Sequence, residues 1–191
     1  MGKNRLEAFS DGVIAIILTI MVLELKVPKE PTIEALSALW PIYVAYTISY
    51  GNVFFVWLNH HGIFSTLERV DFHVLWANGF LLFVVSLVPF ATAFAMESHW
   101  ATPLPVILYG FVMTVVSLAS ARLRVVAARH AQDEQVAAHQ RSGVFISLLQ
   151  AAAFLIGSLC AWFVPRSAML IFAAVPLAGI LYHRGILEDH R

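Results

Sequence analysis

Residues 9–25 read FSDGVIAIILTIMVLEL. After its first three residues the run is apolar except for Thr19 and one glutamate near its end. A helix crosses the hydrocarbon core of a bilayer with about 20 apolar residues. The stretch from about Phe9 to Val27 therefore predicts a transmembrane helix. The acidic Glu7 and Asp11, and the lack of a small-residue cleavage site, argue against a cleaved signal peptide.

The composition extends this prediction to the whole chain. Of 191 residues, 60% are hydrophobic and only 13% are charged, and the mean hydropathy is +0.78. This composition is typical of an integral membrane protein. The formal net charge of zero gives no indication of a nucleic-acid partner. The single cysteine, Cys160, lies in an apolar run and is expected to be a small core residue.

Six segments are apolar and long enough to cross a bilayer, so we predict an all-α, polytopic protein with one domain over residues 1–191. The polar stretch from Arg122 to Arg141 is expected to continue a helix past the membrane surface. The six predicted spans are approximately Phe9–Val27, Ile33–Gly62, Phe72–Ala95, Pro103–Arg124, Ser142–Val164 and Ser167–Tyr182.

The distribution of basic residues predicts the orientation. With six spans, both ends of the chain lie on one side of the membrane. That side would hold nine Lys and Arg residues and the opposite side three, and lysine and arginine concentrate in cytoplasmic loops. We therefore expect a protein of the cell (plasma) membrane with both termini in the cytoplasm. The nine are Lys3, Arg5, Arg69, Arg122, Arg124, Arg129, Arg141, Arg184 and Arg191.

The first predicted helix has two different faces. At about 100° per residue, Ile16, Thr19, Ile20 and Leu23 fall within a sector about 100° wide. Asp11 points about 140° away from Ile16. One interpretation is that the apolar stripe packs in a bundle core and Thr19 bonds back to its own helix. The other interpretation is that this face lines a pathway while Asp11 binds neighbouring helices.

Asp11 itself has two interpretations. With Ser10 it would cap the start of a helix, or it would join a buried network, because charges at membrane depth are rare and usually paired. Polar partners are predicted at the same depth, at the end of the second span and the start of the third. The candidate network consists of Arg5, Ser10, Asp11, Trp57, His60, His61, Trp76 and Asn78.

Signatures of enzymes are absent from the sequence. It has no HExxH pair, no GxSxG elbow and no Gly-rich phosphate loop. His60 and His61 are adjacent, so on a helix they point in different directions and make a poor metal pair. We therefore expect no enzyme activity, no cofactor and no bound metal.

The first helix carries a more specific pattern. Arg5, followed by Phe9, Ser10 and Asp11, reads R-x-x-x-F-S-D. This resembles the signature of the transmembrane protein 175 family of potassium channels. The resemblance extends over nearly the whole chain, through the helix with Ile16 and Thr19, the Leu23–Leu25 ending, the Trp57–His61 stretch and the helix from Asn78 to Phe90. It implies a homotetramer of six-helix subunits, as in the prokaryotic members with one repeat.

The resemblance also implies a mechanism. Four first helices would line a potassium-selective pore, with its narrowest apolar ring at Ile16 and with Thr19, Ile20 and Leu23 beyond it. Such a ring has no ion ligands and blocks current by dewetting, which makes it a hydrophobic gate. Potassium selectivity would be modest, and other monovalent cations or protons are further possible permeants. The network around Asp11 would set the tilt of the helix, and Phe9 belongs to the same motif.

Two other classes of protein compete with a channel. A proton- or cation-coupled secondary transporter would need internal repeats, broken helices and binding groups at mid-membrane. The sequence offers little polar material at that depth beyond Thr19, Asn52 and Ser86. A membrane enzyme or scaffold is the other alternative, and the lack of a catalytic constellation weighs against the enzyme.

Overall fold

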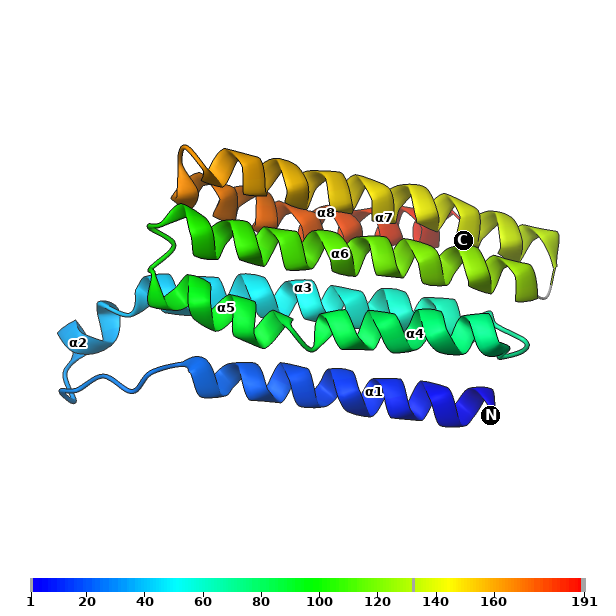
Figure 1. The fold of residues 1–191 in the computed structure, drawn as a ribbon, viewed down its shortest axis with the longest axis horizontal. Coiled ribbons are helices and arrows are strands. Elements are labelled where there is room, and N and C mark those ends of the chain that lie inside the picture. Colours follow the sequence, from blue (N-terminus) through cyan, green and yellow to red (C-terminus); the bar gives the residue numbers. More distant parts are fainter. Residues whose placement is uncertain (1, 132, 190–191) are drawn as a thin grey trace.

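The computed structural model describes the backbone of residues 2–131 and 133–189 and the side chains up to residue 179. The described residues form an elongated bundle of helices (Figure 1), and the fold is all-α as predicted. Arg191, counted above among the cytoplasmic residues, lies outside the described residues. The elements are α1 (Lys3–Ile20), η1 (Met21–Glu24), α2 (Ile33–Ser37), α3 (Trp40–Ser65), α4 (Phe72–Val85), α5 (Val88–Glu97), α6 (Pro103–Ala127), η2 (Ala128–His130), α7 (Glu134–Ala161) and α8 (Pro165–Asp189).

Four helical stretches are long and apolar enough to cross a membrane. They are Lys3–Glu24, Phe72–Glu97, Pro103–His130 and Glu134–Ala161. The helices α3 and α8 run alongside them in the bundle (Figure 1), and α8 is apolar over Pro165–Gly179. The chain is therefore a multi-pass membrane protein.

The first helix begins earlier than its apolar residues suggest. It starts at Lys3 rather than near Phe9, and its first two turns are polar. These turns are held by tertiary contacts, since Lys3 Nζ donates a hydrogen bond to the Ser65 carbonyl oxygen at 3.3 Å. At the other end the helix tightens into the 3₁₀ turn η1, and the chain becomes extended at Leu25.

Two of the predicted spans are broken by proline. The second, predicted to be continuous from Ile33, consists of the short α2 and then α3. Pro41 lies in the first turn of α3, where its missing N–H is tolerated, whereas inside a continuous helix it would remove a hydrogen bond. The third is interrupted at Ser86 and Leu87, and Pro89 lies in the first turn of α5. Figure 1 shows the resulting break between α4 and α5.

The polar stretch between the fourth and fifth spans contains a turn and is not one continuous helix. The chain leaves α6 at Ala127, and α7 begins at Glu134, where the Asp133 carboxylate accepts a hydrogen bond from the Val136 N–H at 2.8 Å. The Val74 N–H and the nearby His130 imidazole hold the pKa of the Asp71 carboxyl below its usual range. Asp71 thus caps α4 and also contacts the turn after α6, at 3.1 Å from His130 Nε2.

One part of the core combines an aromatic cluster with the buried amide of Asn52. Trp100 and Phe172 each pack against the Tyr109 ring, with centroid distances of 5.3 Å. Asn52 Nδ2 donates to the Tyr109 hydroxyl at 3.3 Å and to the Phe172 carbonyl oxygen at 3.2 Å. These contacts join α3, α6 and α8, and Phe154 of α7 packs on Phe172 at 5.6 Å.

Small residues let α6 and α7 approach each other closely. A Cβ on Gly110 would overlap the Ser158 hydroxyl, lie 2.8 Å from Phe172 Cζ and lie 3.1 Å from the Phe154 carbonyl oxygen. Gly157 of α7 is restricted in the same way on the side of α8, because a Cβ there would lie 3.1 Å from Phe172 Cδ1. Small residues at helix interfaces are the usual means of close packing in membranes.

This packing predicts the effect of adding one methyl group. Gly110→Ala should destabilise the protein by about 1–3 kcal/mol, because overpacking forces its neighbours to shift. Gly51→Ala is the control, since nothing lies within 4 Å of its added Cβ. Thermal unfolding in detergent should show a lower Tm for Gly110→Ala only. Equal Tm values for both variants would contradict the close approach of α6 and α7.

Candidate functional site

The first helix lies at one edge of the bundle (Figure 1) and packs against α3, α4 and α5. One side of α1 is buried, and its members are Leu6, Ser10, Ile14 and Ile17. The opposite side is apolar and exposed: Ile16 is 58% exposed and Ile20 43%. Leu23, in η1, is 77% exposed. Within the described part of a single chain, this side is left open.

The exposed stripe contains the four residues predicted to share one face: Ile16, Thr19, Ile20 and Leu23. The core-packing interpretation does not fit a single chain, because these side chains are exposed. The backbone bond expected for Thr19 is present, since its hydroxyl donates to the Ile16 carbonyl oxygen at 2.9 Å. The hydroxyl proton is thus used within the helix, and the lone pairs of the oxygen remain available on the exposed side.

Asp11 points to the other side of α1. Its carboxylate accepts a hydrogen bond from Trp57 Nε1 at 3.0 Å. The capping interpretation of Asp11 is wrong, because α1 begins at Lys3 and Asp11 lies well inside the helix. Trp57 stacks on the His61 ring at 5.8 Å between centroids, and His61 Nδ1 lies 3.6 Å from a Glu7 carboxylate oxygen.

A second, fully buried chain of hydrogen bonds lies beside the first. Asn78 Nδ2 donates to Ser10 Oγ at 2.9 Å, and Ser10 donates to the Leu6 carbonyl oxygen at 2.8 Å. His60 Nε2 lies 2.8 Å from Asn78 Oδ1. Because the Asn78 amide N–H is directed to Ser10, its carbonyl oxygen accepts from His60, which requires a proton on Nε2. This chain joins α1, α3 and α4.

Three residues of the predicted motif and network lie apart from these hydrogen bonds. Phe9 is 58% exposed, Trp76 is 64% exposed and Arg5 is also exposed. Trp76 packs edge-on against Phe72, and the described residues give none of the three a polar partner. Glu7 is the member that sequence reasoning missed. Its signal was available, because Glu7 is four residues before Asp11 and so lies on the same helix face.

Further polar contacts lie elsewhere in the bundle. Arg124 and Gln140 form a buried cluster with Asn59 and Thr66, which the sequence analysis did not predict. At the far end of α1, Lys26 forms an ion pair with Glu97 at the end of α5. Within residues 2–131 and 133–189, no group of three or more His, Cys, Asp or Glu is placed to hold a metal ion.

The buried chain predicts a large effect at Asn78. Asn78→Leu keeps the volume of the side chain but leaves the His60 and Ser10 groups without this partner, at roughly 1–3 kcal/mol each. The control His73→Leu removes an exposed polar side chain from the same helix. The yield of folded protein and its Tm in detergent should fall for Asn78→Leu and stay near wild type for His73→Leu. Comparable values for the two variants would show that the hydrogen bonds of Asn78 do not hold α1 in position.

The amino-acid sequence is similar to those of known proteins over a region that includes these hydrogen bonds. The family model described as "Endosomal/lysosomal potassium channel TMEM175" matches residues 5–89. A potassium channel of Chryseobacterium sp. (strain P1-3) is 38% identical over 184 residues, covering 95% of this chain and 94% of the relative. A potassium channel of Streptomyces collinus is 40% identical over 124 residues, covering 61% of this chain and 60% of the relative.

A solved structure extends the similarity to the fold. The crystal structure of a lysosomal potassium-selective channel TMEM175 homolog from Chamaesiphon minutus superposes with a TM-score of 0.81 at 30% sequence identity. It covers 94% of this chain and 97% of that one. Full-length similarity in sequence and the shared fold agree with the R-x-x-x-F-S-D motif at Arg5 to Asp11. The chain belongs to the TMEM175 family.

Proposed function

We propose that this protein is a potassium channel that conducts passively through a pore lined by α1. The observation that carries the proposal is the exposed apolar stripe of α1, which lies opposite a face that hydrogen bonds hold to α3 and α4. A helix anchored on one side and open on the other is suited to line a pathway shared between subunits. Bacterial relatives named as potassium channels support the same activity.

Assembly of several copies follows from the same geometry. One α1 cannot enclose a pore, and closed rotational symmetry is the usual solution for soluble and membrane oligomers. The α4–α5 segment also exposes large side chains at spacings of three and four residues, which a neighbouring subunit would cover. Those side chains are Phe80, Phe83, Leu87, Phe90 and Phe94. We propose a homotetramer, as the family resemblance implies.

The proposed gate is the ring of Ile16 side chains. Four isoleucines offer an ion no ligands, so a narrow ring excludes water and blocks conduction by dewetting. When the ring widens, an ion passes while keeping most of its hydration. Thr19 lies next along the stripe, and its oxygen can face a cation because its proton is donated to Ile16. Potassium would be favoured over sodium modestly, since it loses water at a smaller cost.

The membrane arrangement is proposed from the position of the chain ends. The start of α1 and the end of α8 point to the same end of the bundle (Figure 1), which supports an even number of crossings. With α3 and α8 as the two further crossings, each subunit has six. The bias of lysine and arginine supports an orientation with both ends in the cytoplasm, for a channel of the plasma membrane.

A secondary transporter is less well supported. Two of the mid-depth polar side chains bond within the chain: Asn52 contacts Tyr109, and Ser86 donates to the Phe83 carbonyl oxygen at 2.6 Å. Thr19 lies on the open stripe and does not line an enclosed site. The relatives are named as channels, which are not a catalytic class, and this supports a protein that is not an enzyme.

The position of Ile16 generates the first functional prediction. Ile16→Asn replaces the dewetting ring by amides that hydrate an ion, so potassium flux into liposomes should rise and discrimination against sodium should weaken. The control Ile17→Asn is adjacent, but Ile17 is only 4% exposed. That variant should lower the folded yield by burying an unpaired amide, without opening the pore. Unchanged flux in intact Ile16→Asn assemblies would rule out Ile16 as the gate.

The flux assay also separates a channel from a carrier. A channel dissipates an imposed potassium gradient rapidly and without a second ion. A carrier saturates with potassium concentration and stops when its coupling ion is removed. Saturating flux that depends on a proton or sodium gradient would support the transporter and contradict the proposal.

Assembly generates the second functional prediction. Cys160, expected above to be a core residue, is exposed in the structure. In a Cys160→Ser background, which removes the only cysteine, Ile20→Cys should allow a short bifunctional thiol reagent to join subunits into dimers and larger species. Ile14→Cys is the control, because Ile14 is fully buried within the subunit. Denaturing gels would report the products. Crosslinking at position 14 but not at position 20 would show that the other face of α1 lies between subunits. That result would contradict a pore lined by Ile16 and Ile20.

A further inference from the structure

A buried arginine at one end of α6 has only neutral partners among the side chains that the structure describes. Arg124 is 5% exposed. Its Nη1 donates to Gln140 Oε1 at 3.1 Å and its Nη2 to Asn59 Oδ1 at 2.7 Å, while Nε has no partner. A buried charge without a counter-charge is costly, and buried charges are normally paired. Among the side chains up to residue 179, the site therefore lacks one negative charge.

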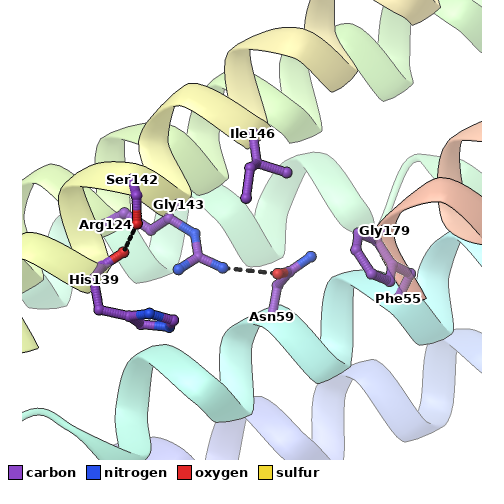
Figure 2. A pocket seen from close by; sticks show the side chains of 8 residues that line it. All are labelled: Phe55, Asn59, Arg124, His139, Ser142, Gly143, Ile146 and Gly179. Carbon is purple, nitrogen blue, oxygen red and sulfur yellow. Dashed lines mark hydrogen bonds between the residues drawn. The ribbon is translucent and has the colours of Figure 1, made fainter. Parts of the chain in front are cut away.

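The fold holds this guanidinium in a fixed position. Gly143 makes room for it, because a Cβ there would overlap Nη1 and lie 2.8 Å from Cζ. Gln140 is in turn fixed by its own hydrogen bond to Thr66 Oγ1 at 2.8 Å. Figure 2 shows the Arg124 side chain reaching from α6 past Gly143 toward Asn59. Such fixed geometry is characteristic of a binding group rather than of a solvated surface charge.

A small cavity of ≈ 10 Å³ lies beside the guanidinium. It is lined by Asn59, Arg124 and Gly143, together with residues of α7 and α8, as drawn in Figure 2. This volume holds about one water-sized atom. The space next to Arg124 therefore accepts a single oxygen atom and not a whole small molecule.

A larger groove between α7 and α8 lies next to the cavity. The groove has a volume of ≈ 550 Å³ and shares Ser142, Ile146 and Gly179 with the cavity. Its remaining lining is almost entirely apolar: Phe145, Leu149, Gln150, Ala153, Val175 and Ala178. Such a groove suits a hydrocarbon chain, and the three shared residues separate it from the cavity that Arg124 lines.

The level of the site in the membrane follows from α7. This helix is polar from Glu134 to Arg141 and apolar beyond Ser142, so the hydrocarbon region begins near Ser142. The cavity lies at this boundary, where lipid headgroups meet acyl chains. Arg122, two residues before Arg124 and about 200° from it around α6, is exposed and lies outside the lining of the cavity.

We propose that the α7–α8 groove and the Arg124 cavity bind one anionic phospholipid. Its acyl chain occupies the groove, and one phosphate oxygen enters the cavity and accepts hydrogen bonds from Arg124. The lipid supplies the missing negative charge, and the Arg124 guanidinium favours a net anionic headgroup over a zwitterionic one, whose own ammonium group it would repel. The bound lipid joins α6, α7 and α8 at their shared end. This proposal requires only a membrane location and is independent of ion conduction.

The test compares lipids that differ only in their headgroup. The purified, assembled protein is titrated in mild detergent with phosphatidylglycerol or phosphatidylcholine of the same acyl chains, and native mass spectrometry and Tm report binding. Wild type should bind phosphatidylglycerol roughly tenfold more tightly, because phosphatidylcholine combines the same phosphate with an ammonium group that the guanidinium repels. Arg124→Gln should lose this preference. Arg122→Gln, which removes an exposed charge from the same helix, should keep it.

A second pair of variants tests the groove without touching the arginine. Ala178→Trp fills the groove, whereas Leu177→Trp adds the same side chain at an exposed position outside its lining. Lipid binding should fall only for Ala178→Trp, even if Arg124→Gln fails to fold. The proposal is overturned if wild type binds both lipids equally, if the two variants of either pair behave alike, or if inorganic phosphate alone gives the full stabilisation.

Discussion

The hydrogen bond from Trp57 to the Asp11 carboxylate fixes which side of α1 faces its own subunit. A carboxylate near the hydrocarbon region needs a donor, and the chain supplies one on α3. Ser10, one residue earlier, is held by Asn78 of α4 in the same way. With both polar groups turned inward, the 3.6-residue period leaves the apolar stripe outward. The rotation of the helix is thus set by two polar contacts, and its exposed face follows.

The bundle divides into a closely packed half and a more lightly attached helix. Glycines and serines bring α6 and α7 together, and the aromatic cluster around Tyr109 joins them to α3 and α8. By contrast, α1 contacts only one side of this assembly, through the hydrogen bonds of Ser10 and Asp11 near its middle and the Lys26–Glu97 ion pair beyond its end. Its opposite side is left free to contact neighbouring subunits.

The all-helical class and the two faces of α1 were predictable, because each depends on local spacing in the sequence. The boundaries of the helices were less predictable from the sequence. Polar turns such as Lys3 to Ala8 form part of α1 through tertiary contacts, which an apolar pattern does not contain. The breaks before Pro41 and Pro89 were visible as prolines, yet only the packing decides whether a proline bends or ends a helix. The buried position of Arg124 was not predictable, because it depends on the space that Gly143 of a second helix leaves for the guanidinium.

The polar contacts of α1 also bear on how the protein is made. The partners of Asp11 and Ser10 lie 46 and 68 residues later in the chain. During synthesis α1 therefore precedes both partners, and these polar contacts form only after α3 and α4 have followed. The helices α6 and α7, by contrast, are neighbours in the chain and pack against each other. The final position of α1 is thus reached later than its place in the sequence suggests.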